Sequence, residues 1–128
     1  MQKRPKEIVE NFLKTVRSGL DPYAAAKFMA PVVTAHQVVS EAEVSIERTP
    51  DEYAEHVIEM KLEFGDFVFE ITELISENDK VFARWKQVGR GVTQVTSCVY
   101  RIKDSKIVEY WIQIDRLGLQ LQNPELTT

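Results

Sequence analysis

The sequence predicts an α+β domain in which helices come first and a strongly curved antiparallel sheet follows. Up to Phe64 the apolar residues recur mainly at helical spacing, whereas after Gly65 they alternate with polar residues at strand spacing. The alternating runs are long and are joined by tight turns, which is typical of an antiparallel sheet. The most apolar run, residues 106–114, is expected to be a central strand of that sheet.

Size and charge limit what the chain can be. With 128 residues and a mass of 14.8 kDa, residues 1–128 are expected to form one domain with its own core. The net charge of -4 and the isoelectric point of about 5.2 disfavour a nucleic-acid-binding surface. No apolar run approaches the roughly 20 residues of a membrane span, and the N-terminus lacks a signal-peptide core. We therefore expect a cytoplasmic protein with neither a nucleic acid nor a membrane as partner.

Two amphipathic helices are expected near the N-terminus. Apolar residues follow helical spacing between Pro5, which suits a first helical turn, and Gly19, which suits a helix end. This pattern predicts a helix over residues 5–18. Pro22, preceded by an aspartate that can cap a helix, restarts the pattern and predicts a short helix ending at residue 29.

A third helix is predicted from Thr49 onward. Thr49 and Glu52 have the spacing of a capping box, in which each side chain binds the other residue's backbone N–H group. Gly65 marks the end of this helix. Four residues at helical spacing form its apolar face: Tyr53, Val57, Met60 and Phe64.

Extended segments make up the rest of the chain. Two short pieces, over residues 32–39 and 41–47, precede the third helix. Longer strands follow it, separated by turns rich in Asn, Asp and Gly, at residues 67–72, 81–88, 92–102 and 106–114. Strands joined by tight turns pair in antiparallel fashion, which gives the predicted sheet.

Several local motifs occur in an order that resembles a known family. The opening helix contains KEIVENFLKTV, and Ala30–His36 matches part of an A-P-D-F-V-x-H segment. Asn78–Trp85 matches an N-D-K/R-V-x-x-R-W strand, and Ser105–Leu119 matches the ending G-K-I-V-E-H-W-D-V-x-D-R-L-G-L. By these motifs the chain resembles a SnoaL-like protein of the nuclear transport factor 2-like, or cystatin-like, superfamily.

The resemblance implies a cone: the curved sheet wraps around N-terminal helices and leaves a deep, mostly apolar pocket. It also implies a homodimer that pairs through the outer face of the sheet. Members include polyketide cyclases, and the wider superfamily includes ketosteroid isomerases, dehydratases, epoxide hydrolases and non-catalytic binding proteins. The fold alone therefore selects no chemistry.

The chain departs from the cyclases at their catalytic positions. Where polyketide cyclases carry an acid/base aspartate after the tryptophan, this sequence has Ile112. A pocket histidine of the cyclases falls on Cys98, and the usual histidine before the tryptophan is Tyr110. Because isoleucine cannot transfer a proton, we do not expect cyclase chemistry of that kind.

Two residues are candidates for catalysis within the implied pocket. His36 matches a family position that lines the pocket, and its imidazole could carry a proton near neutral pH. Tyr110 could donate a hydrogen bond to a carbonyl or an oxyanion. Each could instead be a core residue whose polar atoms are satisfied by neighbours. The residues expected to line the pocket are Phe12, Tyr53, Val57, Met60, Cys98, Tyr100 and Ile112.

Strand alternation extends this assignment along the last strand. If Ile112 faces the pocket, then Val108, Tyr110 and Ile114 share its side. Trp111 then lies on the outer face, where a dimer partner could cover it.

The other polar candidates favour structural roles. His56 is spaced for a surface ion pair with Glu52 or Glu59. Asp115 could cap the turn that follows the last strand or act as a general base, and capping is the better-supported role. The two histidines have no third ligand at metal-binding spacing, so neither a metal nor a cofactor is expected.

Two functional hypotheses follow. The first is a pocket protein for a small, largely apolar molecule, with isomerase, cyclase or hydratase chemistry. The second is a non-catalytic homodimeric binding or structural module. A cavity of a few hundred Å³ with convergent polar groups would favour the first, and a cone filled by large side chains would favour the second.

Overall fold

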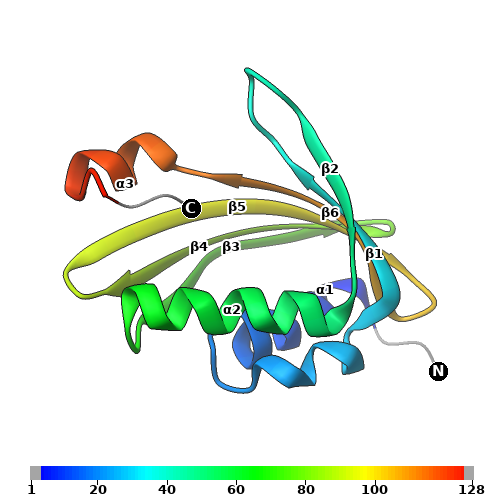
Figure 1. Ribbon diagram of the computed structural model, residues 1–128. Helices are drawn as coiled ribbons and strands as arrows, with labels where there is room; N and C mark the ends of the chain where they lie inside the picture. The colour runs from blue at the N-terminus through cyan, green and yellow to red at the C-terminus, as the bar shows by residue number, and fades with distance from the viewer. Residues whose placement is uncertain (1–3, 126–128) are drawn as a thin grey trace.

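A six-stranded sheet curves around the N-terminal helical segments and α2 (Figure 1). The computed structural model describes residues 4–125. Its elements, in chain order, are α1 Pro5–Phe12, η1 Leu13–Arg17, η2 Pro22–Lys27, β1 Met29–Gln37, β2 Val44–Arg48, α2 Pro50–Phe64, β3 Val68–Glu77, β4 Lys80–Gly89, β5 Val92–Lys103, β6 Lys106–Ile114 and α3 Arg116–Gln122. This arrangement confirms the predicted α+β class with a curved sheet.

The strands lie in the order β2-β1-β6-β5-β4-β3, so β6 is an inner strand, as its apolar sequence predicted. The pairs β1–β2, β3–β4, β4–β5 and β5–β6 are antiparallel. The β1–β6 pair is parallel, and the connection between the two strands is long: it contains β2, α2, β3, β4 and β5. That long-range pairing brings residues near position 35 beside residues near position 110.

The helices match the prediction at their starts better than at their ends. Thr49 and Glu52 form the predicted capping box at the start of α2: the Glu52 N–H donates to Thr49 Oγ1 at 3.2 Å, and Thr49 N–H donates to Glu52 Oε1 at 2.9 Å. The first helix changes from α1 to the wider turns of η1 at Leu13. Met29 belongs to β1 instead of the second helix, and α3 forms where only a turn was expected.

A bulge changes the predicted alternation along β6. The register between β5 and β6 shifts between Arg101 and Ile102, so that Ile107 and Tyr110 both lie in the core although they are three residues apart. Ile107 therefore takes the inward place that strict alternation gave to Val108.

Four aromatic rings fill the centre of the cone. Phe12 lies 5.3 Å from Tyr53 and 5.8 Å from Tyr100, measured between ring centroids. Tyr110 closes the cycle, at 6.0 Å from Tyr53 and 5.9 Å from Tyr100. Because these rings occupy the space beneath the sheet, the open part of the cone is confined to its wide end. None of the helices in the described residues is long and apolar enough to cross a membrane.

Candidate functional site

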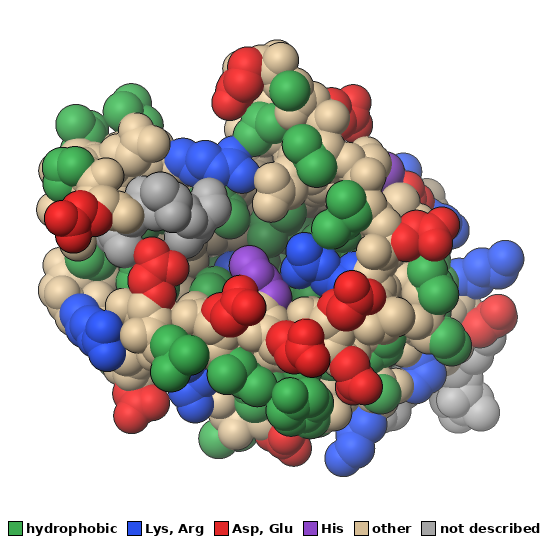
Figure 2. Space-filling view, viewed as in Figure 1, with side chains coloured by type: hydrophobic (Ala, Val, Ile, Leu, Met, Phe, Trp, Pro, Cys, Tyr) green, Lys and Arg blue, Asp and Glu red, His purple; other side chains and the backbone are tan. Residues whose placement is uncertain are grey.

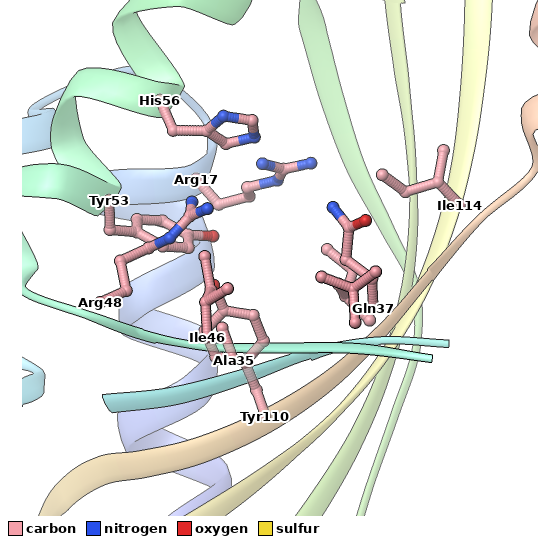
Figure 3. Close-up of a pocket in the computed structure, with 11 residues that line it drawn as sticks. Arg17, Ala35, Gln37, Ile46, Arg48, Tyr53, His56, Tyr110 and Ile114 are labelled. Atoms are coloured by element: carbon pink, nitrogen blue, oxygen red, sulfur yellow. The ribbon is translucent and has the colours of Figure 1, made fainter. Parts of the chain in front are cut away.

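A cavity of about 110 Å³ opens at the wide end of the cone. The two rows of paired strand residues that form its floor run from β2 through β1 to β6: Ile46, Ala35 and Tyr110 in one, and Val44, Gln37 and Ile112 in the other. Residues from η1, β2 and α2 complete the wall: Arg17, Arg48, Tyr53, His56 and, from β6, Ile114 (Figure 3). The cavity is smaller than a typical ligand pocket of about 300–1,000 Å³, because the aromatic rings fill the cone behind it.

The predicted lining residues divide into two groups. Tyr53, Tyr110 and Ile112 line the cavity. The others are buried in the core instead and do not line it: Phe12, Val57, Met60, Cys98 and Tyr100. They were assigned to the lining because a deep pocket was expected where these side chains in fact pack together.

His36 lies on the outer face of the sheet, away from the cavity. Its neighbours in β1, Ala35 and Gln37, both line the cavity, so alternation turns His36 to the opposite side. Its ring is hydrogen-bonded to Ser45 Oγ at 2.7 Å and to Glu109 Oε2 at 2.6 Å, and it stacks on Trp111. The structure therefore separates His36 from Tyr110, and the role of cavity proton carrier does not fit its position.

Arg17 is the most unusual residue of the site. Its side chain is buried, with 1% of the residue exposed, and its Nε has no hydrogen-bond partner. No carboxylate among residues 4–125 forms an ion pair with it. Its guanidinium carbon lies 5.4 Å from the centre of the Trp85 ring, and its charge acts on the nearby Tyr53 phenol. Burying a cation with so few partners costs stability, so this placement calls for an explanation.

The local structure of the chain places Arg17 at the cavity. In η1 the N–H of Ser18 donates to the carbonyl of Leu13 at 2.9 Å, a spacing of five residues. Such π-type turns are rare and occur often at functional sites. The turn leaves Val16 in the core while the Arg17 side chain reaches the cavity wall beneath α2.

His56 and Arg48 bring further polar groups to the same space. His56 lies one helical turn after Tyr53 on α2, and it lines the cavity instead of forming the predicted surface ion pair with Glu52 or Glu59. Burial, together with the charges of Arg17 and Arg48, lowers the pKa of His56 to about 4. The imidazole is therefore neutral at pH 7.

The cavity wall has the opposite charge to the protein as a whole. Among the described residues, its lining contains two guanidinium groups, Arg17 and Arg48, and no aspartate or glutamate, whereas the chain has a net charge of -4. Figure 2 shows a histidine and basic side chains within the hollow, and acidic side chains along its lower rim over α2. A negatively charged group that enters the hollow would thus meet uncompensated positive charge.

The tyrosines of the site act as hydrogen-bond donors rather than as bases. Burial raises the pKa of Tyr110 far above neutrality. Burial also raises the pKa of Tyr53, although the charges of Arg17 and Arg48 oppose that shift. Both phenols are therefore protonated at neutral pH and can donate to an oxygen of a bound molecule.

Two further candidates have structural roles. Asp115 caps α3, since its Oδ1 accepts from the N–H of Gly118 at 3.0 Å. Burial raises the pKa of Cys98 to about 12, so this thiol is not a nucleophile at neutral pH.

Unpartnered polar atoms extend from the cavity into the cone. Within the described residues, the buried atoms without a hydrogen-bond partner include Trp85 Nε1, Thr96 Oγ1, Gln87 Oε1 and both side-chain polar atoms of Gln94. In the backbone register of the sheet, Gln87 of β4 lies opposite Gln94 of β5, and Trp85 lies opposite Thr96. Thr96 in turn lies opposite Ile114 of β6, which belongs to the cavity wall. Buried polar atoms are normally satisfied, so this group is suited to ordered water or to polar atoms of a ligand.

Sequence signals for the missed residues exist in retrospect. Arg17 follows Leu13 by four residues and so continues the buried stripe of the first helix. Arg48 follows Ile46 by two residues and so shares its side of β2. What periodicity could not show was that both stripes end at the same cavity.

Comparison with known proteins agrees with this architecture. A family model described as SnoaL-like polyketide cyclase matches residues 7–123. A comparison with curated protein sequences finds no match. Among solved structures, a candidate polyketide cyclase from Acidithiobacillus ferrooxidans is similar with a TM-score of 0.79 and 23% identity, over 99% of each chain.

Two more distant structures share the fold. A candidate SnoaL-like polyketide cyclase from Jannaschia sp. CCS1 aligns over 99% of this chain and 100% of its own, with 13% identity and a TM-score of 0.79. IdmH of Streptomyces antibioticus, a candidate polyketide cyclase, aligns over 94% of this chain and 98% of its own, with 17% identity and a TM-score of 0.76. At these identities the structures show the common fold, and the family model covers most of the sequence. The chain therefore belongs to the SnoaL-like polyketide cyclase family.

Proposed function

We propose that the protein binds a small organic molecule in the cavity and polarises one of its oxygen atoms by hydrogen bonding. The observation that carries this proposal is the buried Arg17 side chain, which reaches the cavity wall with an unpartnered Nε. Tyr53 and Tyr110 add two protonated phenols to the same wall. Preorganised donors of this kind stabilise negative charge that develops on a carbonyl or enol oxygen.

The apolar part of the lining suits the body of such a molecule. Ala35, Ile46, Ile112 and Ile114 contribute apolar side chains to the lining. Ligand sites commonly combine an apolar lining with a few placed polar groups. A small cyclic or aromatic molecule with one oxygen-bearing end fits this division.

Isomerase, cyclase or hydratase chemistry would also need a group that moves a proton. His56 is the titratable base of the lining, because the wall has no aspartate or glutamate and His36 faces outward. Its low pKa makes it a weak base, which a bound anion would strengthen by offsetting the two guanidinium charges. In the catalytic form of this proposal, His56 takes the place first assigned to His36.

A non-catalytic binding role is the second candidate. Ile112 lines the cavity at the position where the cyclases have their acid, which leaves the site better equipped for binding than for proton transfer. In this form of the proposal the protein would pair as a homodimer through the outer face of the sheet. There the partly buried residues Phe82, Val99 and Trp111 lie in one row across β4, β5 and β6.

A thermal-shift screen against cyclic ketones, lactones, sterols and aromatic polyketides tests binding. A ligand at a hundredfold excess over its dissociation constant stabilises the native state by about 2.7 kcal/mol. We expect hits that weaken in Tyr110→Phe and persist in His36→Ala, which alters the outer face. Hits that respond equally to both variants, or a flat response to every class, would contradict binding in this cavity.

Prolonged incubation of each hit, followed by mass spectrometry and NMR of the small molecule, separates the two candidates. Conversion that slows at least about tenfold in His56→Gln supports catalysis. Recovery of every ligand unchanged supports the binding role.

A further inference from the structure

We infer that the molecule bound in this cavity is an organic carboxylate whose charged end pairs with Arg17 and Arg48. This inference rests on the proposed function and specifies its ligand class. It differs from the small, largely apolar molecule that the sequence suggested. The argument begins with the cost of the unliganded site.

Arg17 keeps a charge in a place where the protein supplies no counterion. Arginine stays protonated in proteins, so burial cannot neutralise it as it neutralises a buried lysine or carboxyl. The described residues offer it the face of Trp85 and the neighbouring Tyr53, but no carboxylate forms an ion pair with it. A binding partner of opposite charge offsets the cost of burying a charge. Arg17 lines the cavity, so a ligand in the cavity can be that partner.

A second guanidinium strengthens the case. Arg48 enters the cavity from the end of β2 and lines it together with Arg17 and Tyr53 (Figure 3). Two like charges that face one space repel each other, and, after burial, both contribute to the lowered pKa of His56. An anion placed between the guanidinium groups would convert this repulsion into attraction.

The chemistry of the donors favours a carboxylate. A guanidinium presents parallel N–H groups that match the two oxygens of a carboxylate, which makes such pairs strong and directional. Tyr53 and Tyr110 can donate to the same oxygens. No aspartate or glutamate among the described residues lines the cavity, although the charge of Arg48 acts on Glu52 nearby.

The size of the cavity limits the rest of the molecule. A volume of about 110 Å³ leaves room for a carboxylate and a single small ring, with the ring against Ile46, Ile112 and Ile114. A larger body would have to project through the mouth of the cone. Small aromatic and alicyclic acids are therefore the class that this site selects.

Benzoate and benzamide form the test pair, since they share a ring and differ in charge. Binding of each to the full chain is measured by NMR titration with the imidazole signals of His56 as reporter of the cavity. We expect benzoate to bind and to shift these signals. Benzamide should bind about tenfold to a hundredfold more weakly, the range expected when a charge-assisted hydrogen bond is lost.

Three variants locate the binding. Arg48→Gln removes the less buried guanidinium and should weaken benzoate about tenfold or more, and benzamide much less, because only benzoate loses an ion pair. Arg17→Met should likewise weaken benzoate more than benzamide. Arg84→Gln removes an equal charge from the exposed outer face, where Arg84 contacts Ser97, and should leave both affinities within about twofold. If Arg17→Met does not fold, Arg48→Gln still decides the question.

The outcomes separate this inference from the proposed function. Equal binding of benzoate and benzamide, with His56 shifted by both, would overturn the carboxylate inference and leave a neutral-ligand pocket standing. Binding of benzoate that is unaffected by Arg48→Gln, or that shifts His36 instead of His56, would also overturn it. Absence of any shift with either compound at millimolar concentration would overturn the inference and count against the proposed pocket as well.

Discussion

The guanidinium carbon of Arg17 lies 5.4 Å from the centre of the Trp85 indole ring, and both side chains are buried. Trp85 comes from the middle of β4, and Arg17 comes from the end of the first helical segment. The contact fixes a cation against the inside of the sheet and directs its remaining N–H groups toward the cavity. A cation–π contact of this kind recovers only part of the cost of desolvating the charge.

This balance predicts that Arg17→Met stabilises the free protein. Methionine can fill the same volume over Trp85 without a charge to bury. We expect the free energy of unfolding, measured in urea, to rise by about 1 kcal/mol or more. The matched variant Arg84→Met, on the exposed outer face, should change it by less than about 0.5 kcal/mol. A loss of stability in Arg17→Met would mean that its contacts with Trp85 and Tyr53 outweigh the burial of its charge.

Ile112→Asp should supply an internal counterion. Ile112 shares the cavity with Arg17 and Arg48, so a carboxylate at this position would pair with a guanidinium and compete with any bound acid. We expect benzoate affinity, measured by calorimetry, to fall about tenfold or more. Ile112→Asn, which adds polarity without charge, should reduce it much less. Unchanged affinity in Ile112→Asp would show that carboxylates do not occupy this space.

His36→Ala tests the assignment of His36 to the outer face. The substitution removes hydrogen bonds to Glu109 and Ser45 and the stacking on Trp111. We expect a loss of about 1–3 kcal/mol in unfolding free energy, because Glu109 then keeps only Arg101 at 3.0 Å. Ligand affinity at the cavity should change less than about twofold, as expected for separated sites. A large loss of affinity in a folded His36→Ala protein would contradict the assignment.

The low pKa of His56 predicts a stability loss in mild acid. The folded pKa is about 4, whereas an unfolded histidine titrates near 6.5, so the unfolded chain takes up the proton first as pH falls. Besides burial, the charges that act on the ring are those of Arg17 and Arg48. Stability should therefore be full above pH 6.5 and should fall toward pH 4. In His56→Gln, thermal melts at pH 7 and pH 5 should differ less than in the parent. Parallel curves for the two proteins would refute the low pKa.

The fold could be predicted from the sequence because several local residue patterns indicated the same elements. Period changes, the capping box at Thr49 and the turns between strands fixed the order of elements and most of their boundaries. The parallel β1–β6 pair could not be predicted from the sequence, because it joins segments far apart in the chain and no local residue pattern specifies it. The bulge beside Ile107 was not predicted for the same reason, since its position depends on the pairing with β5.

Only some of the residues of the candidate site could be predicted from the sequence. Ile112 was assigned to the pocket from the family resemblance, Tyr110 from alternation along the same strand and Tyr53 from the apolar face of α2, and all three line the cavity. His36 was misplaced because the family motif suggested a role that its parity in β1 opposes. Arg17 and His56 were missed because a charged residue at the edge of an amphipathic helix is usually solvated, and only tertiary packing shows otherwise.

The pKa of His56, measured with and without benzoate, is the most direct test, because burial lowers it in both states whereas the part due to the charges of Arg17 and Arg48 is offset only when an anion enters the cavity. It can be measured by following the imidazole signals in an NMR pH titration, with His56→Gln used to assign them. The account predicts a pKa near 4, and a clear rise when benzoate is present. A value near 6.5 in the free protein, unchanged by benzoate, would contradict the claim that the cavity is positively charged and binds an anion.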